Sequence, residues 1–210
     1  RFPENLNNEI ELEFIKESKV KYVVVVAYGK IIPEKFLKIK DLVFLNIHAS
    51  LLPRWRGAAP IQRSIIARDK VTGVSIMKII SKLDAGPYLL QKSIKIKGND
   101  NFLSLSKKLS FEGSELILKA LDLLENDKGK FIEQKEESVT YAKKINKKES
   151  EIKWNDTAEK IVAKINGLGP YPGVWFIHKG TRIKIIEAEI SENNGKPGEV
   201  ITNNLIVACA

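Results

Sequence analysis

The stretch KYVVVVAYGK, residues 21–30, contains the unbroken apolar run on which the prediction of the fold rests. A run that is apolar on both faces is typical of a central parallel strand covered by helices on both sides. Residues 9–18 before it have the apolar spacing of an amphipathic helix, and Pro33 after it favours the start of a short one. Strands alternating with helices predict an open, mostly parallel α/β sheet of the doubly wound kind.

The middle of the chain continues this alternation. Pro60 starts another helix, and Asp100 or Asn101 caps a long helix that Gly129 ends. Further strands are predicted over residues 42–47 and 73–80, and one or two more over residues 86–96.

Beyond this point the sequence changes in character. Residues 128–153 are charged and lack periodicity, so we interpret them as a linker between a first domain, residues 1–127, and a second, residues 154–210. In the second domain, a helix over 156–167 precedes several short strand-like stretches. These predict a small β-barrel or sandwich that is incomplete at its C-terminal end.

The composition favours a globular protein with a polyanionic partner. The net charge is +9 and the isoelectric point about 9.4, although the lysines could serve solubility alone. The single cysteine, Cys209, excludes an internal disulfide and is expected to be a buried structural thiol. No apolar stretch approaches the ~20 residues of a membrane span, and no signal peptide is recognisable, which favours the cytoplasm and no membrane partner. Because the chain begins at Arg1 and ends inside a strand-like run, we expect it to be part of a longer protein.

Three polar residues are candidates for chemistry. Asn46 and His48 are two apart at the end of a predicted strand, so their side chains point the same way, and ligands bind at that end of an open α/β sheet. Asp84 follows a later strand of the same sheet and is expected to reach the same edge. The alternatives are a capping histidine for His48 and a turn-forming aspartate for Asp84.

If these side chains converge, they suit the attack of an amine on a carbonyl group. Asn46 and His48 could hold the oxyanion, and Asp84 could orient His48, hold a water or accept the amine proton. No metal is needed, because the other histidine, His178, lies in the second domain and Cys209 is distant in sequence.

Two basic segments have open interpretations. In the loop after His48, Arg54 and Arg56 could contact phosphate or a carboxylate and Trp55 could stack on a flat group. The alternative is a rigid loop with two solvated arginines and a packed tryptophan. The lysines of the linker could follow an RNA backbone or could form a solvated hinge; they are Lys143, Lys144, Lys147 and Lys148.

The stretch NIHASLLPRWRGAAPIQR, residues 46–63, closely resembles the signature of the folate-dependent formyltransferase family. The stretches VVVVAYGKIIP, GVSIMKIISKLDAGP and TYAKKINKKESEIKWNDTAEKIVAKINGLGPYPGVWF, in this order, resemble its methionyl-tRNA formyltransferase branch. The resemblance covers the chain from about residue 21 onward. It implies a Rossmann-like catalytic domain, lacking its first strands here, that a linker joins to an incomplete OB-like β-barrel.

The resemblance also implies a reaction. The donor is 10-formyltetrahydrofolate, the acceptor is initiator methionyl-tRNA, no metal takes part, and we expect a monomer. Asn46, His48 and Asp84 become the catalytic set, and the folate pterin is expected beside Tyr28, Gly29 and Leu83. The loop expected to bind substrate comprises Ser50, Leu51, Leu52, Pro53, Arg54, Trp55, Arg56 and Gly57.

Three alternatives to this reaction stay open. The chain could formylate another amine, such as a sugar nucleotide, it could hydrolyse formyltetrahydrofolate, or it could be a basic RNA-binding module without catalysis. Because the family's first strands and last barrel strands are absent from the sequence, we expect the 210 residues alone to bind tRNA poorly and to lose activity.

Overall fold

The computed structural model describes residue 3, residues 6–202 and residues 205–210, and it forms two compact units. The first unit comprises Arg1–Ala58, Gly73–Ile94 and Leu109–Ala142. The second comprises Ala59–Thr72, Lys95–Lys108 and Lys143–Ala210. Each unit is therefore assembled from segments that are distant in the sequence.

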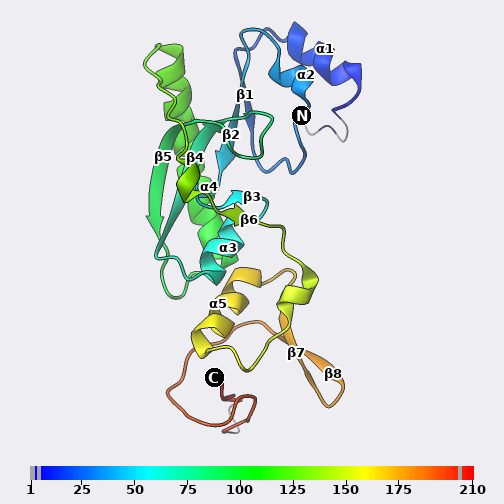
Figure 1. The fold of residues 1–210 in the computed structure, drawn as a ribbon, viewed down its shortest axis with the longest axis vertical. Helices are drawn as coiled ribbons and strands as arrows, with labels where there is room; N and C mark the ends of the chain where they lie inside the picture. Colours follow the sequence, from blue (N-terminus) through cyan, green and yellow to red (C-terminus); the bar gives the residue numbers. More distant parts are fainter. Residues whose placement is uncertain (1–2, 4–5, 203–204) are drawn as a thin grey trace. The chain divides into compact units, whose positions relative to one another are not determined.

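A sheet of four strands in the order β1-β2-β4-β5 forms the centre of the first unit (Figure 1). Its strands are β1 (Tyr22–Val25), β2 (Val43–His48), β4 (Val71–Lys78) and β5 (Tyr88–Lys95). β1 and β2 pair in parallel, as predicted for the run that begins at Tyr22. The α/β fold class is thus confirmed, and each of the four stretches predicted as strand forms one strand, within a few residues of its expected bounds.

The direction of β4 corrects the expected arrangement. β4 runs antiparallel to β2, with Leu45 opposite Lys78 and His48 opposite Ser75. β4 and β5 also run in opposite directions, since Lys78 N donates to Pro87 O at one end of the pair and Ile96 N donates to Lys70 O at the other. Strand direction depends on where the connecting chain re-enters the sheet. The apolar pattern of a strand does not indicate its direction.

Two helices lie beside β1 in the sequence. α1 (Glu9–Glu17) confirms the predicted amphipathic helix, with Asn8 accepting a hydrogen bond from Glu11 N at its start. α2 (Glu34–Leu37) starts after Pro33, as predicted. They contribute to a cluster of buried side chains formed by Leu12, Ile32, Phe36, Leu42 and Phe44.

The expectation that β1 is covered on both faces is not met in the described residues. Val24 on β1 is 40% exposed, and Val26 just beyond it is 56% exposed. An apolar run therefore predicted the strand correctly but did not predict its full burial.

α4 (Phe102–Glu125) is the long helix predicted from its apolar spacing. Asn101 Oδ1 accepts from Ser104 N at the start of the helix, which satisfies one of the amides that the first turn leaves unpaired. The predicted apolar face is confirmed, since Leu105, Leu109, Leu116 and Ala120 are all buried.

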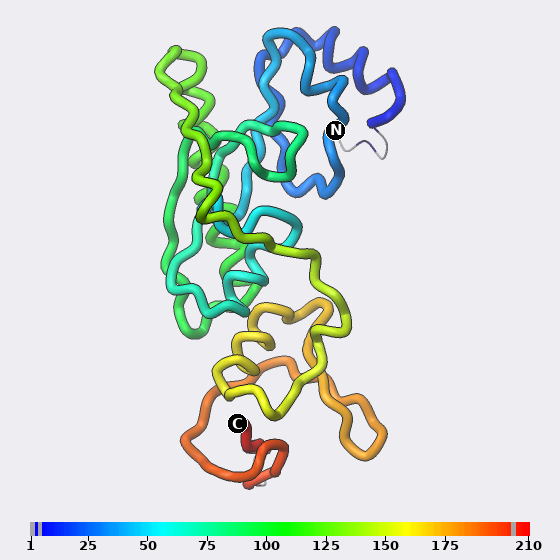
Figure 2. Tube along the Cα trace, in the orientation of Figure 1, coloured from blue at the N-terminus to red at the C-terminus, as the bar shows by residue number. Residues whose placement is uncertain are grey.

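Residues 128–153, interpreted from the sequence as a linker, contain ordered structure. They include two short 3₁₀ helices, η1 (Glu136–Ser138) and η2 (Lys147–Ser150), and the strand β6 (Tyr141–Ala142). β6 pairs in parallel with β3 (Arg56–Gly57), so the yellow-green and cyan parts of the chain run side by side there (Figures 1 and 2). The first half of this segment therefore belongs to the first unit, because backbone hydrogen bonds with distant strands hold it there.

The second unit contains α3 (Pro60–Ile66) and α5 (Ala158–Leu168), which pack against each other. Thr157 caps α5, in agreement with the predicted helix. Arg63 of α3 donates to both carboxylate oxygens of Glu149 and to the carbonyl of Lys143. Polar contacts thus reinforce the apolar packing of this unit.

The strands of the second unit form a small β region. β7 (Val174–His178) and β8 (Thr181–Ile185) make an antiparallel hairpin. Further along the described chain, Val200 and Val207 form only an isolated bridge. The prediction of a small C-terminal β domain is confirmed, while the strand-like stretches after β8 make less regular pairing than expected.

No helix in the described residues combines the length and the apolar character needed to cross a membrane. Cys209 is half-buried, less than expected, beside the apolar cluster of the second unit, and this burial raises the pKa of its thiol. A raised pKa lowers the thiolate fraction, which agrees with the structural role expected for this cysteine.

Candidate active site

His48 is the last residue of β2, and its side chain is only 5% exposed. Its Nε2 atom lies 2.9 Å from the carbonyl oxygen of Trp55. A carbonyl oxygen only accepts hydrogen bonds, so Nε2 carries the hydrogen and Nδ1 of the neutral ring has a free lone pair. The structure therefore assigns a tautomer to His48 that sequence reasoning did not provide.

Asp84 lies in the loop between β4 and β5, next to His48. Its Oδ2 atom is 3.8 Å from His48 Nδ1 and accepts a hydrogen bond of 2.8 Å from Gly57 N. The backbone of Asp84 has a φ of 44°, a conformation that is uncommon for residues other than glycine. The predicted meeting of His48 and Asp84 is thus present in the structure.

The reason given for that meeting was wrong. Because β4 runs antiparallel to β2, its carboxyl end at Lys78 lies opposite Leu45, away from His48. Asp84 reaches the imidazole because the loop after β4 returns toward His48, where Gly57 N donates to the Asp84 carboxylate. A loop conformation, and not a shared strand end, brings the pair together.

The electrostatic surroundings keep His48 neutral. Burial lowers the pKa of His48 below its usual value, and this effect is larger than the opposing effects of the Asp84 charge and the hydrogen bond to Trp55. Asp84 is the one charged group among the described residues that is identified as acting on this pKa. A neutral ring with a free Nδ1 can accept a proton, and Asp84 is placed to stabilise the imidazolium that would result.

We expect the pKa of His48 to lie below about 6.5, the value of an unperturbed histidine. Because the chain has only two histidines, the imidazole signals can be followed by NMR titration and assigned with a His178→Gln variant. A neutral signal persisting below pH 6.5, with the shift pattern of an Nε2-protonated ring, is the expected result. A His48 signal that titrates above that value would contradict the burial argument.

Asn46 lies on β2 between Val25 of β1 and Met77 of β4. Residues two apart on a strand share a face, so Asn46 and His48 project from the same side of the sheet. We find no hydrogen-bond partner for the Asn46 amide among the described residues. Its N–H groups are therefore free to donate to a ligand.

The loop after His48 is held by a dense set of hydrogen bonds. Ser50 is fully buried, and its hydroxyl donates to Arg54 O at 2.6 Å. Ser75 of β4 donates to Ser50 O and accepts from Leu52 N, while Gln91 of β5 donates to Leu52 O. Gly57 adopts a φ of 115° where an added Cβ would lie 2.9 Å from Ala142 O, so this position requires glycine. The loop is thus a fixed part of the site.

Arg56 contradicts the expectation of a solvated or phosphate-binding arginine. Its side chain is fully buried, Nε donates to Gln134 Oε1 at 2.9 Å, and Nη2 donates to Glu136 Oε1 at 3.1 Å. The hydrogen bond from Arg56 lowers the pKa of Glu136. A buried guanidinium needs such partners, and both lie in the supposed linker, while Nη1 has no hydrogen-bond partner among the described residues.

Arg54 and Trp55 contact each other. The guanidinium carbon of Arg54 lies 4.4 Å from the centre of the Trp55 ring, a distance typical of a cation–π interaction. Trp55 therefore has its own neighbour over its ring, and its stacking on a flat group of a ligand stays a prediction.

The residues expected near the folate are less closely connected. The Tyr28 hydroxyl donates to Pro3 O at 2.7 Å, and Leu83, next to Asp84, is 59% exposed. Gly29 has a φ of 70° and open space where a Cβ would be. These observations do not join the three residues to one another, so this grouping stays a prediction.

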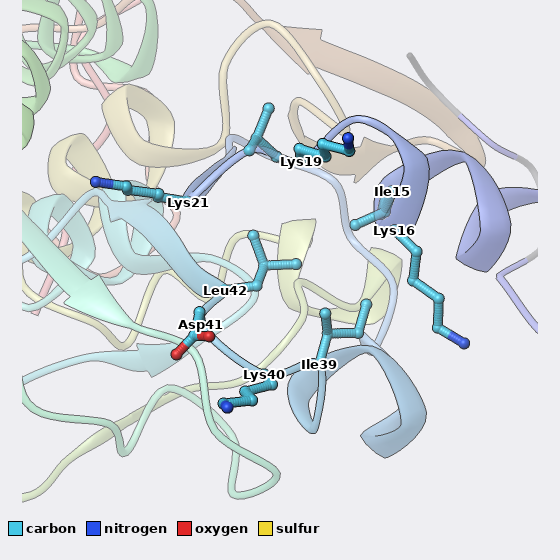
Figure 3. Close-up of a pocket in the computed structure, with 9 residues that line it drawn as sticks. Ile15, Lys16, Lys19, Lys21, Ile39, Lys40, Asp41 and Leu42 are labelled. Carbon is cyan, nitrogen blue, oxygen red and sulfur yellow. The ribbon is translucent and has the colours of Figure 1, made fainter.

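A separate pocket in the first unit contains none of the predicted site residues (Figure 3). Its lining is apolar and basic, formed by Ile15, Lys16, Lys19, Val20, Lys21, Ile39, Lys40, Asp41 and Leu42. The described residues also contain no group of three or more histidine, cysteine, aspartate or glutamate side chains placed to hold a metal ion.

Gln134 and Glu136 are the neighbours of the site that sequence reasoning missed. They lie in the charged segment after α4, where no periodicity or motif distinguishes them from other polar residues. The pairing of β3 with β6, the bridge between Tyr88 and Ile132 and the hydrogen bond from Trp55 N to Thr140 bring this segment to Arg56.

Comparison with known proteins relates this geometry to a family. A protein family described as "Formyl transferase" matches residues 3–121, and a second family, described as "Formyl transferase, C-terminal domain", matches residues 144–210. Methionyl-tRNA formyltransferase of Pelagibacter ubique (strain HTCC1062) is 51% identical over 210 residues, which is 100% of this chain and 68% of that protein.

Two solved structures share the fold. HypX from Aquifex aeolicus in complex with tetrahydrofolic acid has a TM-score of 0.75 at 21% identity, covering 91% of this chain and 34% of that one. A 4-N formyltransferase from Francisella tularensis has a TM-score of 0.74 at 21% identity, covering 91% of this chain and 78% of that one. A family description that matches more than half of the chain, together with a relative 51% identical over all of it, shows that the chain belongs to the methionyl-tRNA formyltransferase family.

Proposed function

We propose that this protein transfers a formyl group from 10-formyltetrahydrofolate to the free amino group of methionyl-tRNA, with Asn46, His48 and Asp84 as the catalytic set. The observation that carries the proposal is the neutral, buried imidazole of His48, whose free Nδ1 lies 3.8 Å from the Asp84 carboxylate. Family membership supports the reaction class, and the chemistry of the three side chains supports their roles.

In this mechanism the amine nitrogen attacks the formyl carbon and His48 Nδ1 takes the proton that the nitrogen loses. Asp84 stabilises the imidazolium while Gly57 N holds the carboxylate in place. The amide of Asn46 donates to the oxyanion as it forms, a role worth about 2.7–4 kcal/mol for a well-placed donor. The bond from carbon to N10 of the folate then breaks, and the imidazolium returns its proton to that nitrogen.

This assignment of roles refines the sequence hypothesis for His48. Nε2 is occupied by the carbonyl of Trp55, so Nδ1 is the nitrogen left for proton transfer. A donor role toward the oxyanion therefore falls to Asn46, whose amide has no partner among the described residues.

The folate-type donor is supported by the family and by the tetrahydrofolic acid in the HypX structure. We place the pterin beside Tyr28, Gly29 and Leu83, and the acceptor along the loop of residues 50–57. The buried Arg56 would support that loop from within and would not touch the substrate.

The tRNA would be held by the basic surface of the chain. Lys143, Lys144, Lys147 and Lys148 are exposed, as contacts with a phosphate backbone require. We propose a catalytic domain over residues 1–127, a connecting segment over 128–153 and a C-terminal domain over 154–210, acting as a monomer in the cytoplasm, where charged initiator tRNA is used.

A formylation assay with three acceptors tests the proposal, on a chain of the relatives' full length because we expect the 210 residues alone to lose activity. Charged initiator tRNA, an amino-sugar nucleotide and water are each supplied with 10-formyltetrahydrofolate, and the formylated product and free formate are measured. Formyl-methionyl-tRNA as the main product is the expected result. Transfer to the sugar nucleotide alone, or release of formate alone, would favour the sugar formyltransferase or the hydrolase, and tRNA binding without product would favour the RNA-binding module.

A further inference from the structure

Gln134 is a buried glutamine that joins three parts of the first unit. Its side chain is 8% exposed. In the sequence, Gln134 follows α4 and precedes β6, far from His48 and Asp84. The mechanism described above does not use it. Its amide nevertheless makes hydrogen bonds to the loop that carries Asp84 and to Arg56, the neighbour of Gly57.

The amide nitrogen of Gln134 holds the loop that carries Asp84. Nε2 donates to the carbonyl oxygen of Asp84 at 2.9 Å and to that of Gly86 at 2.7 Å. Asp84 has a φ of 44°, and a non-glycine residue keeps such a conformation only when its surroundings fix it. The two hydrogen bonds supply that fixation from one side chain.

The amide oxygen of Gln134 holds the segment that receives the Asp84 carboxylate. Oε1 accepts from Arg56 Nε at 2.9 Å, and the next residue, Gly57, donates its N–H to Asp84 Oδ2 at 2.8 Å. The neutral amide of Gln134 thus connects the backbone of Asp84 with Arg56. The neighbour of Arg56, Gly57, donates the N–H that orients the Asp84 carboxylate.

We infer that Gln134 is a positioning residue for the formyl-transfer reaction. Its hydrogen bonds set the distance between the Asp84 carboxylate and His48. The inference rests on the proposed catalytic set. Because the Gln134 amide uses both its donor and its acceptor, no other side chain of similar size can replace it. Glutamate keeps the acceptor for Arg56 but turns an anion toward two carbonyl oxygens, and leucine leaves all three partners unsatisfied.

The charged groups around Gln134 form a short chain. Arg56 Nη2 donates to Glu136 Oε1 at 3.1 Å, and Lys82 Nζ lies 3.3 Å from Glu136 Oε2. Gln134 is the uncharged link between these charges and Asp84. Displacement of Asp84 would weaken the effect by which its charge raises the pKa of His48, so that pKa would fall further.

The test compares Gln134→Glu and Gln134→Leu with Asn126→Leu. Asn126 is a matched control, because its side-chain amide also donates to a backbone carbonyl, that of Asp122, within the same unit, and it lies exposed just after α4. We expect each Gln134 variant to lower kcat about tenfold or more with KM within about twofold, because small displacements of a reacting group cost rate. The NMR titration should move the pKa of His48 downward in Gln134→Leu, which adds no charge, and leave it in place in Asn126→Leu.

A double-mutant cycle with Asp84→Asn separates positioning from general support of the fold. If Gln134 acts through Asp84, adding Gln134→Glu to Asp84→Asn should cost less than about twofold further in kcat. Wild-type kcat and His48 titration in a folded Gln134→Glu variant, or full additivity in the cycle, would overturn the inference. Should Gln134→Leu fail to fold, Gln134→Glu carries the test because it preserves size and the bond to Arg56. Full activity of Asp84→Asn alone would instead count against the proposed catalytic set.

Discussion

Replacing His48 with alanine should lower kcat for formyl transfer by roughly 10²–10⁴-fold, the range typical of losing a general base. The ring is buried at the end of β2, and Nδ1 is the nitrogen left to accept a proton, since Nε2 donates to Trp55 O. KM for the tRNA should change little, because the proposed role of His48 is in proton transfer. A formylation assay at saturating substrate, with binding measured separately, checks both expectations.

The design needs a control for the fold, because alanine also removes a buried ring. His48→Gln keeps an N–H able to donate toward Trp55 O but has no nitrogen that accepts a proton near neutral pH. It should be as inactive as His48→Ala while unfolding closer to the wild-type temperature. More than about a tenth of wild-type kcat in a folded His48→Gln protein would contradict the role of His48 as a base.

Replacing Asp84 with asparagine should lower kcat by roughly 10²–10³-fold. Two unit charges about 4 Å apart interact by about 4 kcal/mol at an effective dielectric constant of about 20, and the 3.8 Å between Asp84 Oδ2 and His48 Nδ1 falls near this distance. Asparagine retains an oxygen that can accept from Gly57 N, so the loop should keep its shape while the imidazolium loses its counter-charge. The pKa of His48 should also fall, since Asp84 now raises it.

Asp127→Asn is the matched control for this substitution. Asp127 also has a positive φ, of 54°, but lies exposed after α4. It should keep wild-type activity and leave the His48 titration unchanged. A loss of activity in Asp84→Asn without any change in the His48 pKa would show that Asp84 acts on the substrate and not through the imidazole.

The contrast between Asp84 and Arg56 shows how far the sequence could predict the site. His48 and Asp84 were predicted to converge, and they do, although β4 runs in the direction opposite to the one assumed. Arg56 was predicted from its residue type to face solvent or phosphate, and it is fully buried. Residue type indicates what a side chain can do, but its partners decide where it lies, and those partners are about 80 positions away in the chain.

The same reasoning applies to the segment interpreted as a linker. Residues 128–153 have no apolar periodicity, and short strands such as β6, with two residues, leave no detectable pattern. Their order comes from hydrogen bonds to β3 and from the burial of Gln134 and Arg56 together. Such contacts join distant parts of the chain, so no local window of sequence contains them.

The sequence by itself determined the elements whose cause is local. The apolar run after Tyr22, the spacing along α4 and the cap at Asn101 each depend on residues a few positions apart, and all formed as expected. Only the tertiary structure decided the direction of β4, the tautomer of His48 and the burial of Arg56. These depend on which distant backbone groups are near enough to pair, because a buried polar group must find a partner wherever the folded chain supplies one.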